Sequence, residues 1–147
     1  MAHSPMVIAI DGPSGVGKST VARAVAERLG LPYVESGAMY RAVALLALET
    51  ATPLADAAAL GAIAKRAEFR FESSAAGNRL WLDGRDVTEA IRSEDVTHAA
   101  SIVSTHATVR THLVERQRAL GAAGGVVMEG RDIGTVVFPD ADLKIFL

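Results

Sequence analysis

The sequence predicts an α/β fold in which a mainly parallel core sheet is interrupted by a small antiparallel insertion. One observation is an apolar, β-branched run at residues 7–11, followed by a glycine-rich loop and then by apolar residues at helical spacing. A second is that residues 126–128 and 143–147 are largely apolar, as strands buried on both faces of a parallel sheet are. A third is the strict alternation in residues 68–72 and 79–83, which is typical of an antiparallel hairpin.

Residues 12–19 connect the first strand to the first helix and fit the phosphate-loop pattern G-x-x-x-x-G-K-[ST]. The glycines let backbone N–H groups turn inward around phosphate oxygens, and the helix N-terminus adds a partial positive charge. Lys18 can reach the β- and γ-phosphates of a nucleotide, and the Ser19 hydroxyl can ligate Mg²⁺. A glycine-rich turn without a ligand is the alternative, but the flanking strand and helix favour a phosphate site. The residues expected to bind the nucleotide are Gly12, Pro13, Ser14, Gly15, Val16, Gly17, Lys18, Ser19 and Thr20.

The first helix is expected over residues 20–29, with Gly30 ending it. A short strand is expected at residues 33–35. A second helix then runs from Ser36 to about Thr50, with Ser36 as its N-cap. The pair Thr52-Pro53 is expected to open a third helix that ends near Ala67.

The insertion is expected to begin with a hairpin, because the turn-rich residues 73–78 separate the two alternating segments. Asp83-Gly84 is a second turn signal and leads to a third short strand at residues 85–87. Trp81 is interpreted as a packing residue of this hairpin. The strands of the insertion are therefore antiparallel, unlike those of the core.

Two further helices are expected near residues 95–105 and 108–120, and they precede the buried strand at residues 126–128. The turn at Pro139-Asp140 then leads to the strand at residues 143–147. A parallel strand is normally followed by a crossover helix, and this sequence ends at Leu147. We therefore expect the sequence to be part of a longer chain.

Composition and net charge argue against several classes of protein. The sequence has 147 residues, which is enough for one domain, and a formal net charge of −2, which argues against a general affinity for nucleic acid or anionic membranes. It has no cysteine, so a disulfide framework and a thiolate metal site are excluded. No signal peptide or membrane span is expected, and the predicted location is the cytoplasm.

Polar residues follow two predicted strands at the sheet edge where open α/β sheets bind ligands. Arg41 lies in the helix after the second strand, where its forked guanidinium can bind a phosphate through two hydrogen bonds. The alternative is that Arg41 is a solvated surface residue. Glu129, Arg131 and Asp132 follow the buried strand at 126–128, and their convergence near a phosphate loop favours a binding role. Arg110 lies on an amphipathic helix, and for this residue a solvated surface position is as strong an expectation as a binding role. Three histidines without a metal-ligand pattern are expected at the surface: His98, His106 and His112.

Four segments together resemble the bacterial cytidylate kinases: residues 12–20, 36–41, 87–92 and 129–139. The resemblance extends over nearly the whole chain, and the last segment is the most specific. It implies a P-loop three-layer sandwich, with a core at residues 1–64 and 104–147 and a nucleoside-monophosphate-binding insertion at 65–103. It further implies transfer of the ATP γ-phosphoryl group to CMP or dCMP by a monomer that binds neither nucleic acid nor membrane.

The resemblance also implies individual roles. Lys18 and the loop amides would hold the donor phosphates, with Ser19 as a Mg²⁺ ligand and Glu129 near the metal shell. Arg41 and Arg131 would clamp the acceptor phosphate. Ser36 and Tyr40 would lie beside that clamp, and Ser101, Arg110 and Asp132 would read the cytosine. Cytosine offers an amino donor and acceptors at N3 and O2, so a carboxylate, a hydroxyl and an arginine suit it, whereas uracil reverses this polarity.

The sequence departs from the family in one respect, since members continue through an arginine-rich lid, a final helix and strand, and an adenine-binding loop. The lid arginines neutralise charge during transfer, so their absence bears on the activity of this chain by itself. Two alternatives remain: a small-metabolite kinase similar to shikimate kinase, and a nucleotide-binding fragment without catalysis. The hairpin insertion and residues 129–139 argue against the first of these.

Overall fold

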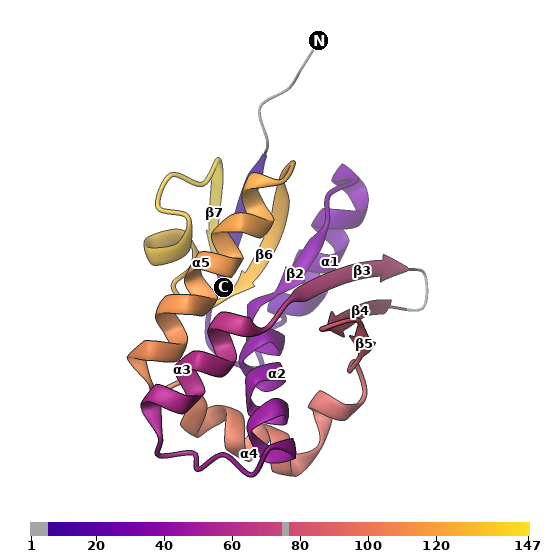
Figure 1. Cartoon of the computed structure of the whole chain (residues 1–147). Coiled ribbons are helices and arrows are strands. Elements are labelled where there is room, and N and C mark those ends of the chain that lie inside the picture. The colour runs from indigo at the N-terminus through magenta and orange to yellow at the C-terminus, as the bar shows by residue number, and fades with distance from the viewer. Residues whose placement is uncertain (1–5, 75–76) are drawn as a thin grey trace. The chain divides into compact units, whose positions relative to one another are not determined.

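The structure is a computed structural model that describes residues 6–74 and 77–147 (Figure 1). The chain divides into two compact units. The first unit combines the chain up to Ser36 with Arg116–Leu147, and the second is Gly37–Glu115.

The first unit is built on a parallel four-stranded sheet. Its strands are β1 (Val7–Asp11), β2 (Tyr33–Glu35), β6 (Val126–Gly130) and β7 (Leu143–Phe146), in the order β2-β6-β1-β7. β1 lies between β6 and β7, and the register pairs Asp11 with Gly130 on β6 and with Phe146 on β7. The carboxyl ends of these strands are therefore level, and the loops that follow them emerge at one edge of the sheet. This parallel sheet, with the separate antiparallel sheet of the second unit, confirms the predicted fold class.

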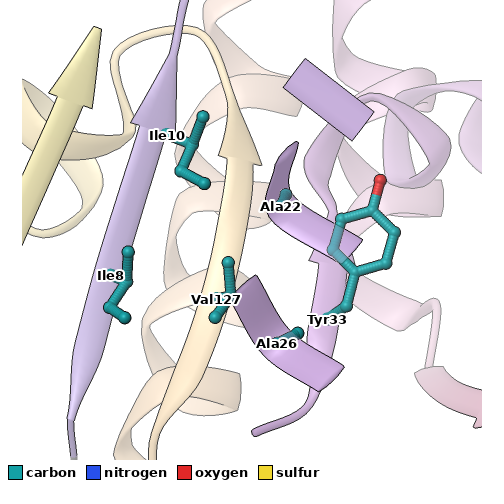
Figure 2. Close-up of a cluster of buried hydrophobic side chains, with 6 residues drawn as sticks. All are labelled: Ile8, Ile10, Ala22, Ala26, Tyr33 and Val127. Atoms are coloured by element: carbon teal, nitrogen blue, oxygen red, sulfur yellow. The ribbon is translucent and has the colours of Figure 1, made fainter. Parts of the chain in front are cut away.

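Helix α1 (Lys18–Leu29) packs on this sheet through small residues. Figure 2 shows Ala22 and Ala26 of α1 beside Ile8, Ile10, Tyr33 and Val127 of the strands. Alanines at this spacing share one face of the helix and let its backbone come close to the sheet. α1 ends at Gly30, whose left-handed backbone (φ 66°) lets its N–H bond to the carbonyl groups of Ala26 and Glu27. The packing fixes the start of α1 against the end of β1, and the glycine-rich loop connects these two points.

The second unit contains helices and a three-stranded antiparallel sheet. α3 (Ala57–Arg66) and α4 (Glu94–Val103) lie within it, whereas α2 (Ser36–Glu49) and α5 (Ala107–Ala122) each continue past its boundary. The sheet consists of β3 (Phe69–Ser74), β4 (Gly77–Leu82) and β5 (Arg85–Asp86), in that order. Arg70 pairs with Trp81 across the hairpin, and its guanidinium lies 5.0 Å from the centre of the indole ring. Trp81 is thus a packing residue of the hairpin, as expected.

Several boundaries differ from the sequence prediction. α3 begins at Ala57 and not at Thr52-Pro53, because the Asp56 carboxylate accepts the Ala59 N–H at 3.0 Å and caps the helix there. The expected connection at 73–78 is shorter, since β3 reaches Ser74 and β4 starts at Gly77, and residues 75–76 lie outside the described residues. Two short elements were not predicted: a 3₁₀ helix, η1 (Ala90–Arg92), and a π-helical turn, η2 (Ile133–Val137).

Of the three histidines expected at the surface, His98 is exposed, whereas His106 and His112 are partly buried. The ring of His106 lies 2.8 Å from the carbonyl oxygen of Leu54, and that contact ties the start of α5 to the loop before α3. Nδ1 of His112 lies 3.8 Å from Glu115. Within residues 6–74 and 77–147, no helix is long and apolar enough to cross a membrane.

Candidate active site

Two glycines of the phosphate loop occupy positions that a side chain would disfavour. Gly17 directly precedes α1 with a φ of 92°, a left-handed conformation that a side chain disfavours. Gly12 follows β1, and a Cβ there would lie 2.7 Å from the carbonyl oxygen of Leu147. Both positions therefore require glycine for a local physical reason, one for its conformation and the other for close backbone contact.

Lys18 folds back over this loop. Its ammonium donates hydrogen bonds to the carbonyl oxygens of Gly12 at 2.7 Å and Pro13 at 3.1 Å. The positive charge is thus held over the loop between β1 and α1. An ammonium in this position can exchange its carbonyl partners for phosphate oxygens, which are stronger acceptors because they are charged.

Glu129, Ser19 and Tyr33 form a buried polar cluster at the carboxyl end of β6. Glu129 is 4% exposed, and its Oε1 accepts hydrogen bonds from the Ser19 hydroxyl and the Tyr33 hydroxyl, each at 3.3 Å. Burial, followed by the negative charge of Glu35, raises the pKa of Glu129 above its ordinary value. Burial and the neighbouring Glu129 likewise raise the pKa of Tyr33. The cluster joins α1, β2 and β6 next to the phosphate loop.

This cluster also contains the oxygen ligands on which a Mg²⁺ site would depend. Mg²⁺ is usually bound through one or two protein oxygens, several waters and the phosphates of the substrate. The Ser19 hydroxyl and the Glu129 carboxylate, 3.3 Å apart, fit that donor set. Among the described residues, no group of three or more His, Asp or Glu side chains forms a self-sufficient metal site. The metal would therefore depend on the nucleotide phosphates for its remaining ligands.

Arg131 and Asp132 follow β6 and lie beside the loop. The Arg131 guanidinium donates a hydrogen bond to the Ser14 hydroxyl at 3.2 Å. Asp132 has a left-handed backbone with a φ of 59°. Just before them, a Cβ on Gly130 would overlap the side chain of Ser36, which is itself buried. The structure therefore places Ser36 against Gly130, and Arg131 and Asp132 beside the phosphate loop.

An open hollow of about 400 Å³ lies between the loop and the segment after β6. Its lining residues are Asp11, Gly12, Pro13, Arg131, Asp132, Thr135 and Phe146. The hollow thus has backbone of the phosphate loop on one side and the Arg131 guanidinium on the other. Such a surface suits a phosphorylated ligand.

Asp11 and Arg118 contribute to this region although the sequence analysis assigned neither of them a role. The two carboxylate oxygens of Asp11 accept the backbone N–H groups of Ile133 and Gly134, each at 2.8 Å. Arg118 donates to the carbonyl oxygens of Val136 at 2.7 Å and Val137 at 3.0 Å. The one available signal was an acidic residue at the end of an apolar strand, directly before the glycine-rich loop.

The remaining predicted site residues belong to the second unit. Arg110 donates to the carbonyl oxygens of Ser104 at 3.1 Å and Thr105 at 2.8 Å, so its guanidinium binds the end of α4. The Ser101 hydroxyl donates to the carbonyl oxygen of His98 at 2.7 Å, within α4. Tyr40 and Arg41 lie on α2, and Arg41 is partly buried. Their approach to the phosphate loop stays a prediction.

Known proteins match this chain over almost its whole length. The family model described as Cytidylate kinase matches residues 8–147. The chain belongs to the cytidylate kinase family. It is 56% identical over 95% of its length to "Cytidylate kinase" of Pelotomaculum thermopropionicum and 54% identical over 95% to "Cytidylate kinase" of Desulfitobacterium hafniense. It is also 51% identical over 100% of its length to "Bifunctional pantoate ligase/cytidylate kinase" of Parasynechococcus marenigrum.

The chain is shorter than these cytidylate kinases. It spans 62% of the Pelotomaculum protein, 60% of the Desulfitobacterium protein and 29% of the bifunctional protein. The match nevertheless includes the phosphate loop, Glu129, Arg131 and Asp132. Family membership confirms the resemblance drawn from the sequence motifs, and it supports a kinase interpretation of the site.

Proposed function

We propose that the full-length protein transfers the γ-phosphoryl group of ATP to CMP or dCMP, giving ADP and CDP or dCDP. The observation that supports this most directly is the hydrogen bond between Arg131 and Ser14, 3.2 Å long. It joins a residue expected to bind the acceptor phosphate to the loop expected to bind the donor phosphates. Membership of the cytidylate kinase family supports the choice of cytosine nucleotides.

In this proposal, the donor half of the site consists of the phosphate loop and its neighbours. Backbone N–H groups and Lys18 bind the donor phosphates, and the ammonium leaves the carbonyl groups of Gly12 and Pro13 to do so. Ser19 and Glu129 would hold Mg²⁺, which when bound neutralises phosphate charge. The hydrogen bond between their side chains supports this assignment, because it places the two oxygens 3.3 Å apart, within reach of one ion.

The residues of the acceptor half are assigned by their match to the family motifs. Arg131 and Arg41 bind the 5′-phosphate of CMP, and Ser36 and Tyr40 lie beside it. Asp132, Ser101 and Arg110 pair with the polar edge of cytosine. Residues 65–103 form the insertion that receives the monophosphate. These assignments rest on the match of residues to the family motifs and on the position of Arg131 and Asp132 beside the loop.

Transfer is direct and in line. An oxygen of the CMP phosphate attacks the γ-phosphorus, the bond to the bridging oxygen breaks, and ADP leaves with that oxygen and its electron pair. No phosphorylated enzyme forms. The protein contributes positioning and charge neutralisation and does not need a strong base, because the attacking phosphate oxygen is already ionised.

We also propose that the protein acts in the cytoplasm as a monomer and that it binds neither nucleic acid nor membranes.

An acceptor screen tests the proposal. The full-length protein is incubated with ATP, Mg²⁺ and CMP, dCMP, UMP, AMP or shikimate, and ADP release is measured. Turnover is expected with CMP and dCMP. Turnover with shikimate instead would support the small-metabolite kinase, and binding of ATP and CMP without turnover would support a non-catalytic module. Either result contradicts the proposed reaction.

A further inference from the structure

Asp11 connects the phosphate loop to the segment that follows β6. It is the last residue of β1 and directly precedes Gly12. Its side chain reaches across to that segment: Oδ1 accepts the Ile133 N–H and Oδ2 accepts the Gly134 N–H, both at 2.8 Å. Its own carbonyl oxygen accepts the N–H of Leu147 at 2.9 Å, just after β7. One residue thus binds the segments that follow both neighbouring strands of β1.

The segment that Asp11 binds has an unusual conformation. η2 is a single π-helical turn, a form found frequently at functional sites. The first N–H groups of any helix lack a partner within it, and Asp11 supplies partners for two of them. At the other end, Arg118 donates to two carbonyl groups of η2. A carboxylate therefore holds the start of the turn and a guanidinium holds its end.

The residues expected to contact CMP lie immediately before this turn. Asp132 has a φ of 59°, and a non-glycine residue keeps such a backbone only where the surrounding structure fixes it. Ile133 and Gly134, which follow it, are both buried and bound to Asp11. Within the turn, the Asp132 carbonyl oxygen accepts the Val136 and Val137 N–H groups at 2.9 and 3.2 Å. The bonds to Asp11 hold the start of that same turn, so they fix the backbone of Asp132 from its C-terminal side together with these contacts.

We propose that Asp11 is a positioning residue that holds Arg131 and Asp132 at the acceptor site, a role that rests on the proposed CMP kinase function. Because Asp11 is joined to Gly12 by a peptide bond, the same residue sets the spacing between the donor loop and the acceptor segment. Each of its oxygens already binds a backbone N–H, which fixes the orientation of the carboxylate and favours positioning over proton transfer. A shift of about 1 Å in such a segment is enough to impair transfer substantially.

The test compares Asp11→Asn and Asp11→Ala with Asp142→Asn in the full-length protein. Asp11→Asn keeps the shape but sets an amide NH₂ against a backbone N–H, and Asp11→Ala removes both acceptors. Asp142 is the matched control, because its Oδ2 accepts the Val7 N–H at 2.8 Å, the same kind of bond at the opposite end of β1.

A positioning role predicts a specific kinetic pattern. In both Asp11 variants, KM for CMP is expected to rise about 10-fold and the preference for CMP over UMP to fall about 10-fold, as for loss of one charge-assisted hydrogen bond. KM for ATP is expected to change less than KM for CMP. Asp142→Asn is expected to leave all three quantities unchanged. A merely structural role would lower the fraction of active enzyme, and hence kcat, without altering KM or base preference, and that result would overturn the proposal.

Amide hydrogen exchange separates this proposal from the proposed function. Without nucleotide, the Ile133 and Gly134 amides are expected to exchange slowly in the wild type and in Asp142→Asn, and faster in the Asp11 variants. If the wild type does not phosphorylate CMP, the proposed function fails while this measurement still tests the contact. If the variants do not fold, rapid exchange of these two amides in the folded wild type would contradict the proposal.

Discussion

Arg131 donates a hydrogen bond to the hydroxyl of Ser14 across a distance of 3.2 Å. The residue expected to hold the acceptor phosphate is therefore already in contact with the loop expected to hold the donor. Both side chains are exposed, so the bond is easily exchanged for one to a ligand. In the proposed site, Arg131 therefore lies between the donor phosphates and the acceptor phosphate.

Replacing Lys18 with alanine is expected to lower kcat by orders of magnitude in the full-length protein and to leave the fold intact. The ammonium neutralises charge on the transferred group, and such interactions act mainly in the transition state. Its contacts in the free protein are two loop carbonyl groups, which solvent can bind instead. Steady-state kinetics and circular dichroism measure the two effects. Lys144→Ala, an exposed lysine on β7, is the control, and equal loss in both variants would contradict the donor role.

Arg131 and Arg41 are expected to bind the 5′-phosphate, so cytidine should be a very poor substrate. Arg131→Ala or Arg41→Ala should raise KM for CMP, and kcat should also fall where the phosphate is misplaced. Isothermal titration calorimetry with CMP and cytidine measures the phosphate contribution directly. Arg28→Ala, an exposed arginine in the last turn of α1, is the control. Equal affinities for CMP and cytidine would rule out the clamp.

Asp86 is expected to make stability depend on pH in the acid range. Its carboxylate accepts hydrogen bonds from the Thr88 hydroxyl at 2.6 Å, from the Thr88 N–H at 3.0 Å and from Arg79 at 2.6 Å. Bonds from Thr88 first, and from Arg79 next, lower the pKa of Asp86 to about 2. Since this pKa is below that of the unfolded chain, the stabilisation is present above pH 4 or so and is lost as the pH falls towards 2.

The measurement for Asp86 is the thermal unfolding temperature of wild type and Asp86→Asn between pH 6 and pH 2. The variant is expected to be less stable at pH 6, and the difference is expected to shrink towards pH 2. Glu72→Gln is the control, because its pair with Arg70 is well exposed and contributes little. A difference between wild type and Asp86→Asn that does not depend on pH would contradict the linkage.

The parts of the fold that sequence analysis predicted correctly are those with a local signal. β1, the glycine-rich loop and α1 were predictable because a strand buried on both faces leaves a continuous apolar run and a phosphate loop has a fixed spacing. Lys18 was singled out by the spacing of the loop motif, and Glu129 and Arg131 were singled out because they lie at the carboxyl end of β6. The start of α3 was misplaced, since Pro53 indicates a helix start while the stronger cap, Asp56, lies three residues further on.

The π-helical turn after β6 could not be predicted, because its geometry depends on distant residues. Asp11 is 122 positions away from Ile133, and Arg118 is 18 positions away from Val136. Nothing in residues 133–137 distinguishes this turn from an ordinary loop. For the same reason the bond from Tyr33 to Glu129, across 96 positions, was not foreseen, and Tyr33 was expected only as part of a strand.

Asp132→Ala is expected to reduce the preference for CMP over UMP. In the proposed site, the Asp132 carboxylate accepts from the amino group of cytosine and Arg110 donates to N3 and O2. A site of this kind can discriminate by as much as ~10⁴-fold, because the wrong base leaves buried polar groups unpaired. Loss of the carboxylate should cost roughly 1–3 kcal/mol, mainly as weaker use of CMP.

The measurement for Asp132 is kcat/KM with CMP, dCMP, UMP and AMP for the wild type, Asp132→Ala and the control Asp140→Ala, an exposed aspartate in the turn before β7. The control should behave as the wild type does, and AMP should not be used by any of them. CMP and dCMP should both be accepted, because none of the three base-reading residues is assigned to the ribose 2′-position. If Asp132→Ala kept the full preference, or if the wild type used UMP as efficiently as CMP, base recognition would have to lie elsewhere, since no other carboxylate is assigned to the cytosine amino group.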